Sequence, residues 1–253
     1  MRAILLCAGQ GTRLRPLTED RPKCLVPYRG RPILDRAVET LRACGIRDLA
    51  VVTGYRADLL EGRGLTPRHN IDYASTNMVH SLFCAEDLMA GGFLVVYGDI
   101  VFHPRLVRAL LEDPSDCATA VDSEWASLWR LRGLDPVRDA ETLKVGPGGE
   151  IRELGRAPSG PADVQGQYIG LIRFSARGAE AARAFYHGLD PRGPYAGRDL
   201  RGMFMTAFLQ EAIDRKALEV RPVWVKGGWA EVDSTEDLAA YERTPPELLE
   251  ARP

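Results

Sequence analysis

This chain of 253 residues contains little lysine, histidine and cysteine, and it is almost neutral. Four of its 33 basic residues are lysines, it has five cysteines and four histidines, and its formal net charge is −2. The charge balance and the lack of a basic run give no indication of nucleic-acid binding. The cysteines are odd in number and form no Cys-x-x-Cys pattern, so we expect buried thiols in a reducing compartment.

Long hydrophobic runs are also missing. No stretch approaches the roughly 18 apolar residues of a membrane-spanning helix, and the apolar segment at residues 1–7 is too short for a signal peptide. The sequence therefore predicts a cytoplasmic protein that does not bind a membrane. With 45% hydrophobic residues, a chain of this length can form one large α/β domain with a sizeable core.

The most informative stretch lies near the N-terminus. The apolar residues 3–7 predict a buried strand, which ends in the turn Gly-Gln-Gly-Thr-Arg at residues 9–13. The two glycines let the backbone approach a ligand closely, and successive N–H groups in such a turn bind anions. Arg13 and Lys23 would add charge-assisted contacts to phosphate. A P-loop would need Gly-Lys-Ser/Thr, and a dinucleotide-binding turn would need a third glycine where this chain has Leu14.

Beyond this turn, helical and strand periodicity alternate, as in a doubly wound sheet with parallel returns. Residues 122–165 are rich in Gly, Pro, Asp and Arg, and we interpret them as an insertion that folds over the sheet as an acceptor lid, with a hairpin turning at Gly148-Gly149. We expect one domain over residues 1–244 and a tail at 245–253. The expected strands are 3–7, 49–53, 70–73, 93–97, 117–121, 168–174 and 218–225, and the expected helices are 32–44, 57–61, 78–89, 104–111, 177–186, 203–215 and 235–243.

Acidic residues occupy positions suited to a metal. Asp99 follows the predicted strand 93–97 directly after Gly98, at the carboxyl end of the strand, where an open α/β sheet holds its ligands. The structural alternative is an aspartate that begins a loop. Glu231 and Asp233 lie one residue apart, so in an extended segment both point to the same face and repel each other unless a cation lies between them.

Two further groups have a structural and a binding interpretation. Thr76 and Asn77 can cap the helix that follows, or they can contact a nucleobase together with Ser81. Trp125 and Trp129 lie one helical turn apart, and they form either core packing or an aromatic wall for a quaternary ammonium group. Lys144 and Arg173 are candidate contacts to a phosphate or carboxylate, and the sequence does not rank them.

Several motifs resemble those of known nucleotidyltransferases. Gly-x-Gly-x-Arg followed by Arg21-Pro22-Lys23 resembles the signature of enzymes that join an NTP to a phosphorylated sugar or alcohol. Asn-x-x-x-Ser-Leu at 77–82, Gly-Gln-Tyr-Ile-Gly at 166–170 and Trp-Ala-Glu-Val-Asp-Ser at 229–234 resemble the phosphocholine and phosphonate cytidylyltransferase branch. Members that use uridine or thymidine nucleotides usually carry a Gly-rich stretch in place of the first of these three. The resemblance covers residues 3–238.

This resemblance implies a Rossmann-like three-layer α/β/α fold with a mostly parallel sheet and a small inserted subregion that covers the substrate, as in the nucleotide-diphospho-sugar transferases. It implies transfer of CMP from CTP to a small phosphorylated or phosphonate acceptor, such as phosphocholine, an aminoalkylphosphonate, an amino-acid amide phosphate or a polyol phosphate, with release of pyrophosphate. A homodimer is compatible with it. The alternatives are a sugar-1-phosphate nucleotidyltransferase that uses another NTP, and a non-catalytic nucleotide-binding regulator.

Residue roles follow from the same resemblance. Lys23 and Arg13 are the expected catalytic residues, and Asp99 and Asp233 are the expected ligands of Mg²⁺. A mere sensor would need no such pair of metal carboxylates. The expected nucleotide-binding residues are Leu6, Ala8, Gly9, Gln10, Gly11, Thr12, Arg13, Lys23, Thr76, Asn77, Ser81 and Gly98, and the expected acceptor-binding residues are Asp122, Trp129, Gln167, Tyr168 and Glu231.

Overall fold

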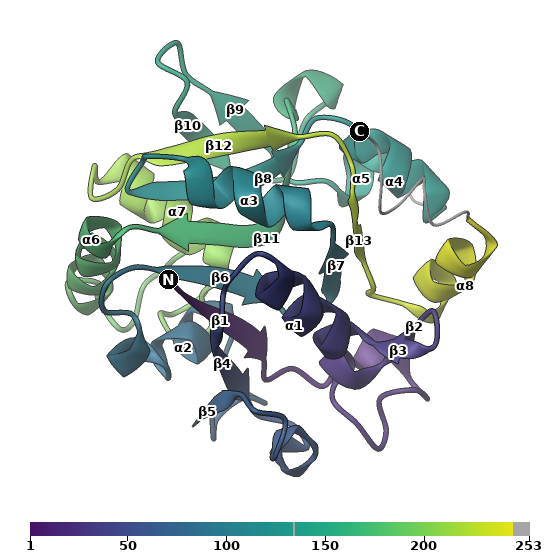
Figure 1. Cartoon of the computed structure of the whole chain (residues 1–253). Helices are drawn as coiled ribbons and strands as arrows, with labels where there is room; N and C mark the ends of the chain where they lie inside the picture. Colours follow the sequence, from purple (N-terminus) through teal and green to yellow (C-terminus); the bar gives the residue numbers. More distant parts are fainter. Residues whose placement is uncertain (134, 245–253) are drawn as a thin grey trace.

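A seven-stranded sheet forms the centre of the computed structural model, which describes residues 1–133 and 135–244 (Figure 1). Its strands are β1 (Arg2–Cys7), β4 (Asp48–Thr53), β5 (Thr66–His69), β6 (Phe93–Tyr97), β8 (Cys117–Asp122), β11 (Gln167–Phe174) and β12 (Val220–Val225). They lie in the order β12-β8-β11-β6-β1-β4-β5. Only β11 runs antiparallel to its neighbours in this sheet, so the prediction of a mostly parallel sheet is confirmed.

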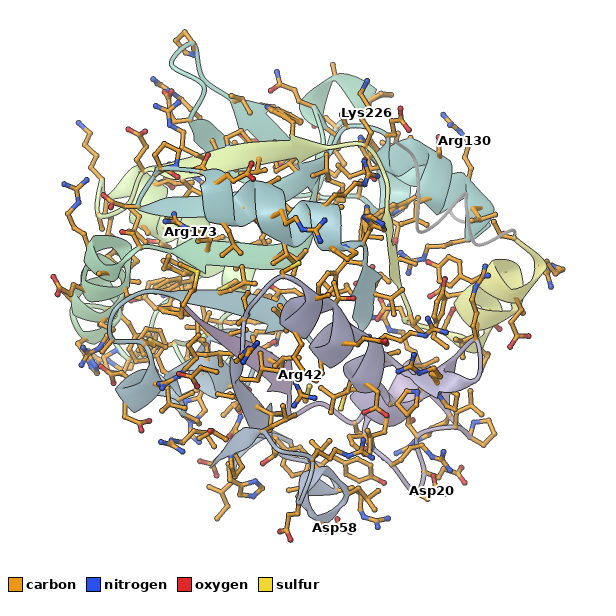
Figure 2. All side chains as sticks on the ribbon, viewed as in Figure 1. Asp20, Arg42, Asp58, Arg130, Arg173 and Lys226 are labelled. Carbon is orange, nitrogen blue, oxygen red and sulfur yellow. The ribbon has the colours of Figure 1, made fainter. Side chains whose placement is uncertain are left out.

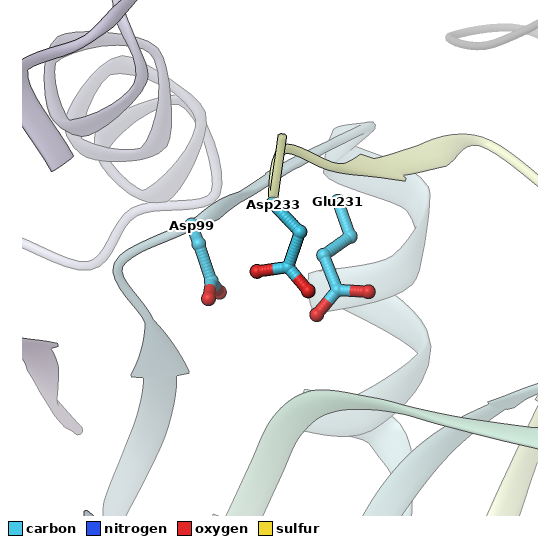
Figure 3. A group of neighbouring side chains, drawn as sticks. All are labelled: Asp99, Glu231 and Asp233. Carbon is cyan, nitrogen blue, oxygen red and sulfur yellow. The ribbon is translucent and has the colours of Figure 1, made fainter. Parts of the chain in front are cut away.

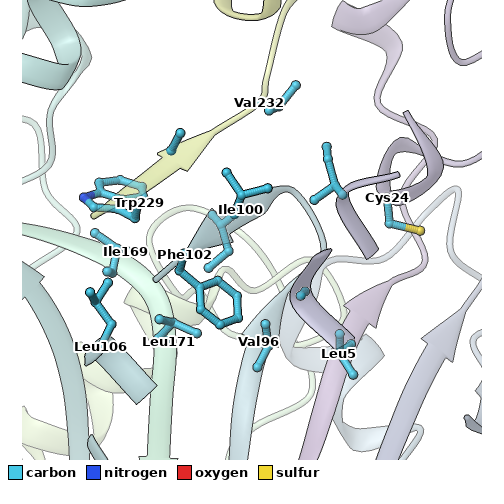
Figure 4. Close-up of a cluster of buried hydrophobic side chains, with 14 of the residues drawn as sticks. Leu5, Cys24, Val96, Ile100, Phe102, Leu106, Ile169, Leu171, Trp229 and Val232 are labelled. Atoms are coloured by element: carbon cyan, nitrogen blue, oxygen red, sulfur yellow. The ribbon is translucent and has the colours of Figure 1, made fainter. Parts of the chain in front are cut away.

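Helices cover both faces of this sheet (Figure 1). On one face lie α1 (Ile33–Ala43) and α3 (Pro104–Glu112), and on the other lie α2 (Met78–Phe83), α6 (Ala176–His187) and α7 (Met205–Asp214). Alternate side chains of β1 enter opposite hydrophobic clusters, because successive residues of a strand point to opposite faces: Leu5 packs in one cluster and Ile4 in the other. Figure 4 shows Leu5 and Val96 in the first cluster. Burial on both faces explains why these strands are continuously apolar, and it gives the expected three layers.

The segment between β8 and β11 contains α4 (Trp125–Leu131), α5 (Pro136–Asp139) and the strands β9 (Leu143–Val145) and β10 (Ile151–Leu154). The last two form an antiparallel hairpin, and Gly149 has a φ of 85°, so the predicted turn at Gly148-Gly149 is confirmed. The hairpin packs on α7, where the Gln210 side chain accepts a hydrogen bond of 2.8 Å from the backbone N–H of Leu154. The proposed tail at 245–253 lies outside the described residues.

Short elements complete the chain. The strands β7 (Ile100–Phe102) and β13 (Trp229–Glu231) pair antiparallel, and α8 (Thr235–Arg243) follows them. A small hairpin joins β2 (Pro27–Tyr28) to β3 (Arg31–Pro32). Single 3₁₀ turns are η1 (Thr12–Leu14), η2 (Lys23–Leu25), η3 (Ala57–Leu60), η4 (Glu86–Leu88) and η5 (Pro161–Asp163). Within the described ranges, no helix is long and apolar enough to cross a membrane.

Two predicted elements were wrong. The strand expected at 70–73 lies earlier, as β5, because the Asn70 side chain accepts a hydrogen bond from the Asp72 N–H and turns the chain there. The helix expected at 78–89 ends at Phe83 and is followed by the separate turn η4. Hydrogen bonds of the 3₁₀ type, between residues three apart, replace the α-helical pattern there. They run from the Ala85 N–H to the Leu82 carbonyl and from the Leu88 N–H to the Ala85 carbonyl.

Candidate active site

The turn after β1 folds back so that Lys23 passes directly beside it. Gly11 has a φ of 75°, and a Cβ atom there would lie 2.8 Å from the Cβ of Lys23. The Thr18 hydroxyl donates a 2.8 Å hydrogen bond to the Gly11 carbonyl and holds the turn closed. Glycine is therefore required at position 11 both for its backbone conformation and for the close approach of Lys23.

Asp99 is placed by the close contact of β1 and β6. A Cβ atom on Gly98 would lie 2.5 Å from the Leu6 carbonyl oxygen, so no other residue fits between the ends of these strands without displacement. After Asp99 the chain continues as β7, which pairs with β13, and the Val232 N–H donates a 2.9 Å hydrogen bond to the Asp99 carbonyl. This pairing brings Asp233 beside Asp99 although they are far apart in sequence.

Three carboxylates meet where these segments end. Asp99, Glu231 and Asp233 each offer an oxygen atom, and these atoms lie within 4.8 Å of one another (Figure 3). The Lys23 ammonium donates to Asp99 Oδ2 at 2.7 Å and also to Asp233 Oδ1. The guanidinium of Arg13 lies 2.9 Å from Asp233 Oδ2. A compact cation thus already bridges two carboxylates of this cluster.

The cluster fits a divalent cation such as Mg²⁺. Its donors are carboxylate oxygens, which hard divalent cations prefer. Asp99 Oδ1 is buried and has no hydrogen-bond partner among the described residues, which leaves a ligand atom free. The ammonium group of Lys23 is a stand-in for the positive charge that the three carboxylates need.

Electrostatics couple these groups. Burial alone would lower the pKa of Lys23, but the charges of Asp99 and Asp233 outweigh burial and raise that pKa above its ordinary value. Burial likewise tends to raise the pKa of Asp233, yet Lys23 and Arg13 hold it below the usual range. For Glu231, burial and the charges of the two aspartates raise the pKa well above that of an exposed glutamate.

A buried arginine behind the cluster was missed by the sequence analysis. Arg132 donates from Nε to Asp237 Oδ1 at 2.8 Å and from a terminal nitrogen to Glu231 Oε2 at 3.1 Å. Asp237 also forms a capping box with Ser234 at the start of α8. No local signal marks Arg132, because its partners lie about a hundred positions further along the chain.

A cavity of about 330 Å³ opens over the turn and the carboxylates. Most residues expected to bind the nucleotide line it, whereas Gln10 and Thr12 do not. Its lining also includes Tyr73 and Met78, which the sequence analysis did not single out. The expected residues in the lining are Leu6, Ala8, Gly9, Gly11, Arg13, Lys23, Thr76, Asn77, Ser81, Gly98, Asp99, Glu231 and Asp233.

Asn70 lies behind the cavity lining and binds two of the side chains that form it. It is fully buried, and its amide donates 2.9 Å hydrogen bonds to the hydroxyls of Thr76 and Ser81. Asn77 lines the cavity and also caps α2, since its side chain accepts from the Met78 N–H at 2.8 Å. The predicted capping role of Asn77 is therefore confirmed, and contact of this segment with a nucleobase stays a prediction. Asn70 was missed because the pattern placed it inside a strand.

A second cavity of about 290 Å³ adjoins the first and shares Arg13, Met78, Glu231 and Asp233 with it. Trp129, Gln167 and Tyr168, three of the residues predicted to bind an acceptor, line this second cavity together with Tyr97, Glu141 and Thr206. Trp125 does not line it; its ring packs edge-on against Trp129 with centroids 5.8 Å apart. One tryptophan therefore faces the cavity and the other belongs to the core.

Asp122, expected to contact the acceptor, lines neither cavity. It is 1% exposed and accepts 2.9 Å hydrogen bonds from the indole N–H of Trp229 and the backbone N–H of Gly227. Its place in an acceptor site is corrected to that of a buried residue that orients Trp229. Lys144 instead pairs with Asp163 at 2.9 Å, and Arg173 donates to the Ser115 carbonyl at 2.7 Å.

Comparison with known proteins identifies the family. Residues 3–156 match the MobA-like NTP transferase domain. The CTP:phosphoglutamine cytidylyltransferase of Campylobacter jejuni is 38% identical over 251 residues, which cover 94% of this chain and 98% of that protein. The 2-aminoethylphosphonate cytidylyltransferase of Lancefieldella rimae is 26% identical over 252 residues, 95% of this chain and 91% of that protein.

The fold has solved counterparts. The structure of CTP:phosphocholine cytidylyltransferase from Streptococcus pneumoniae superposes with a TM-score of 0.71 at 23% identity, over 95% of this chain and 97% of that one. At this identity the likeness concerns the fold alone. With a family match over more than half of the chain and a full-length relative, this chain belongs to the MobA-like NTP transferase family and is a nucleotidyltransferase.

Proposed function

We propose that this nucleotidyltransferase is a cytidylyltransferase that transfers CMP from CTP to a small phosphorylated or phosphonate acceptor. The observation that carries the proposal is the pair of adjoining cavities that share Arg13, Glu231 and Asp233. CTP would occupy the first cavity and the acceptor the second, so that the reacting groups meet at the shared boundary. The near full-length likeness to a CTP:phosphoglutamine cytidylyltransferase supports CTP as the donor.

The transfer is a displacement at the α-phosphorus of CTP. An oxygen of the acceptor phosphate or phosphonate forms a bond to that phosphorus, and the bond to the bridging oxygen of the β-phosphate breaks, so pyrophosphate leaves with the electron pair. Both reactants are anions, so catalysis depends on holding them in line and neutralising their charge. We assign this work to Lys23 and Arg13, with the backbone N–H groups of the Gly9–Gly11 turn facing the phosphates.

Mg²⁺ is the cation that we propose for the carboxylate cluster. Asp99 and Asp233 would hold it, with Glu231 beside them. When bound, the ion supplies positive charge to the triphosphate and to the departing pyrophosphate. Lys23 would then exchange its present carboxylate partners for phosphate oxygens, since both sets of partners are anionic and adjoin the same cavity.

The second cavity favours an acceptor that carries a positive group besides its phosphate. Glu141 and Glu231 line it, together with the rings of Trp129 and Tyr168. Arg13, at the boundary with the first cavity, is the one cationic residue among its described lining residues. Carboxylates and aromatic faces attract an ammonium group, while Arg13 is placed to receive the phosphate. Phosphocholine, aminoethylphosphonate and phosphoglutamine all meet this description.

We further propose that the enzyme works in the cytoplasm, because its free cysteines suit a reducing compartment and CTP is found there. The described cysteines form no disulfide. A homodimer is the assembly that we propose to test, by light scattering of the purified protein. We propose no nucleic-acid or membrane partner.

A panel of pyrophosphate-release assays tests the proposed function. Each of CTP, UTP, ATP and GTP is combined with phosphocholine, aminoethylphosphonate, phosphoglutamine and glucose-1-phosphate. We expect turnover with CTP and at least one ammonium-bearing acceptor, because a hydrogen-bonded site separates cytosine from uracil by their exocyclic groups. Equal turnover with UTP and CTP would defeat the CTP assignment, and turnover with glucose-1-phosphate alone would favour a sugar-phosphate nucleotidyltransferase.

A further inference from the structure

Arg132 lies directly behind the carboxylate cluster. It caps the C-terminal end of α4, and its side chain is 3% exposed. Its guanidinium binds Asp237 with two nitrogens, at 2.8 and 3.2 Å, and Glu231 with a third contact at 3.1 Å. It also lies over the Trp129 ring, 5.3 Å from the centroid. The planar guanidinium group of Arg132 is bound by three partners, so a lysine ammonium in its place would lose some of these contacts.

Asp237 extends this arrangement to the backbone of the proposed metal ligand. Its Oδ2 atom accepts 2.9 Å hydrogen bonds from the backbone N–H groups of Asp233 and Ser234. The carboxylate that holds Arg132 therefore also holds the main chain from which the Asp233 side chain projects. Through Asp237 and Glu231, one buried arginine fixes both acidic residues of this segment.

Arg132 differs from the two other cations of the cluster. Lys23 and Arg13 line the first cavity and are placed to reach the phosphates of a nucleotide. Arg132 lines neither cavity, and besides its contacts to Asp237 and Glu231 one of its terminal nitrogens lies 3.8 Å from Asp233 Oδ2. Of the three, it is the cation with no access to a ligand in either cavity.

We propose that Arg132 is a positioning residue, which orients Glu231 and the Asp233 backbone so that the acidic cluster can bind its divalent cation. This inference rests on the proposed function, because it concerns the cation site of that function. It makes a prediction that differs from that of a simple charge effect. A substitution that keeps the charge of Arg132 should leave cation binding unchanged if only charge matters, whereas loss of the contacts that orient the ligands should weaken it.

The test measures binding of Mn²⁺, used as the probe, to the full-length protein with CTP and without acceptor, by water-proton relaxation. Arg132→Lys keeps the charge but removes the fork. We expect it to weaken Mn²⁺ binding by about tenfold to a hundredfold, the range typical of groups that orient metal ligands. CTP affinity measured in EDTA should change by no more than about twofold, since Arg132 lines neither cavity.

A second variant and a matched control complete the test. Asp237→Glu keeps the negative charge but displaces the carboxylate that binds the fork, and it should weaken Mn²⁺ binding in the same direction. Arg130→Lys, in α4 and exposed at the surface in Figure 2, should leave Mn²⁺ binding unchanged. Unchanged or tighter Mn²⁺ binding in both Arg132→Lys and Asp237→Glu would overturn the positioning role. Failure of the wild-type protein itself to bind Mn²⁺ with CTP would overturn the proposed metal site instead, and this inference with it.

Discussion

At the scale of single residues, the notable contact is the one between Lys23 and the acidic cluster. Its ammonium is bound by Asp99 and Asp233, the two residues proposed as metal ligands. Without nucleotide, the lysine and a divalent cation would therefore compete for the same oxygens. Phosphates in the first cavity would offer Lys23 other anionic partners and release the carboxylates. The same residue would thus serve the empty site as a counter-ion and the loaded site as a catalyst.

Replacement of Lys23 tests both parts of this account. Lys23→Ala should lower kcat by about a hundredfold or more, because the lysine ammonium stabilises negative charge that develops in the transition state. The affinity for CTP should fall much less. Without nucleotide, the same variant should bind Mn²⁺ more tightly than wild type, since the competing ammonium is gone. Steady-state kinetics and an electron paramagnetic resonance titration of Mn²⁺ measure the two effects.

The comparison variants for Lys23 separate charge from geometry. Lys23→Arg should restore little activity, because a planar fork does not replace a compact ammonium in a tight site. Lys226→Ala, an exposed lysine at the surface in Figure 2, should behave as wild type. If Lys23→Ala changed only the KM for CTP, the residue would bind nucleotide equally in ground and transition states and would not be catalytic.

Glu141 gives a prediction about pH. Burial raises its pKa above the ordinary value of 4.5, and the described residues give it no hydrogen bond or ion pair. A carboxyl group whose pKa is raised by folding favours the native state while it is neutral, and this stabilisation is lost as the pH rises from 4.5 through the folded pKa. Glu141→Gln cannot ionise, so its stability relative to wild type should increase across that range.

Urea unfolding of Glu141→Gln and wild type between about pH 4 and 8 measures this difference. The two proteins should be similar in stability at the acidic limit, and the variant should be more stable at the neutral one. Glu19→Gln, at an exposed position, serves as the control and should follow the wild-type curve. A stability difference that does not change with pH would show that Glu141 contributes through packing alone.

At the level of secondary structure, the sequence correctly predicted the elements with a clear apolar pattern. The strands at β1, β4 and β6 and the helix α8 lie where periodicity placed them, and the Gly-rich turn and Gly98-Asp99 lie at the predicted strand ends. Failures came where a side chain redirects the backbone, as Asn70 does after β5. The carboxylates at the last strand were found, but Arg132 was not, because long-range ion pairs leave no local pattern.

Gly98 connects the end of strand β6 to Asp99 in the acidic cluster. A methyl group there would lie 2.5 Å from the Leu6 carbonyl and 2.9 Å from the Cys7 sulfur, so Gly98→Ala must push apart the ends of β1 and β6. Overpacking of this kind destabilises a protein by about 1–3 kcal/mol. We expect a loss of that size in the free energy of unfolding, measured with urea, together with reduced activity, since Asp99 is the next residue.

Gly160→Ala is the matched control for this substitution. Position 160 has no heavy atom within 4 Å of an added Cβ, and its φ of −174° suits alanine. It should therefore unfold within about 0.5 kcal/mol of wild type, as surface substitutions commonly do. Equal stability of the two alanine variants would show that the ends of β1 and β6 can separate without cost.

In the molecule as a whole, two cavities lie side by side at the carboxyl ends of the central strands. The first is lined mainly by residues up to Asp99, with Glu231 and Asp233 added, and the second draws its lining mainly from residues after Tyr97. The pairing of β7 with β13 places the acidic cluster between them. In the proposed function this arrangement would hold a donor and an acceptor side by side over shared charged groups, which is what transfer between two phosphorylated molecules requires.

A product balance followed by ³¹P NMR tests directly whether the protein transfers CMP from CTP to an acceptor. Wild-type protein, Mg²⁺, CTP and the best acceptor of the panel are incubated together, with Asp99→Asn as the matched variant. We predict that CMP-linked acceptor and pyrophosphate appear in equal amounts, and that Asp99→Asn forms them more slowly by about a hundredfold or more, because it lacks a charge proposed to hold the metal. Release of inorganic phosphate without a CMP-linked product, or undiminished turnover by Asp99→Asn, would contradict it.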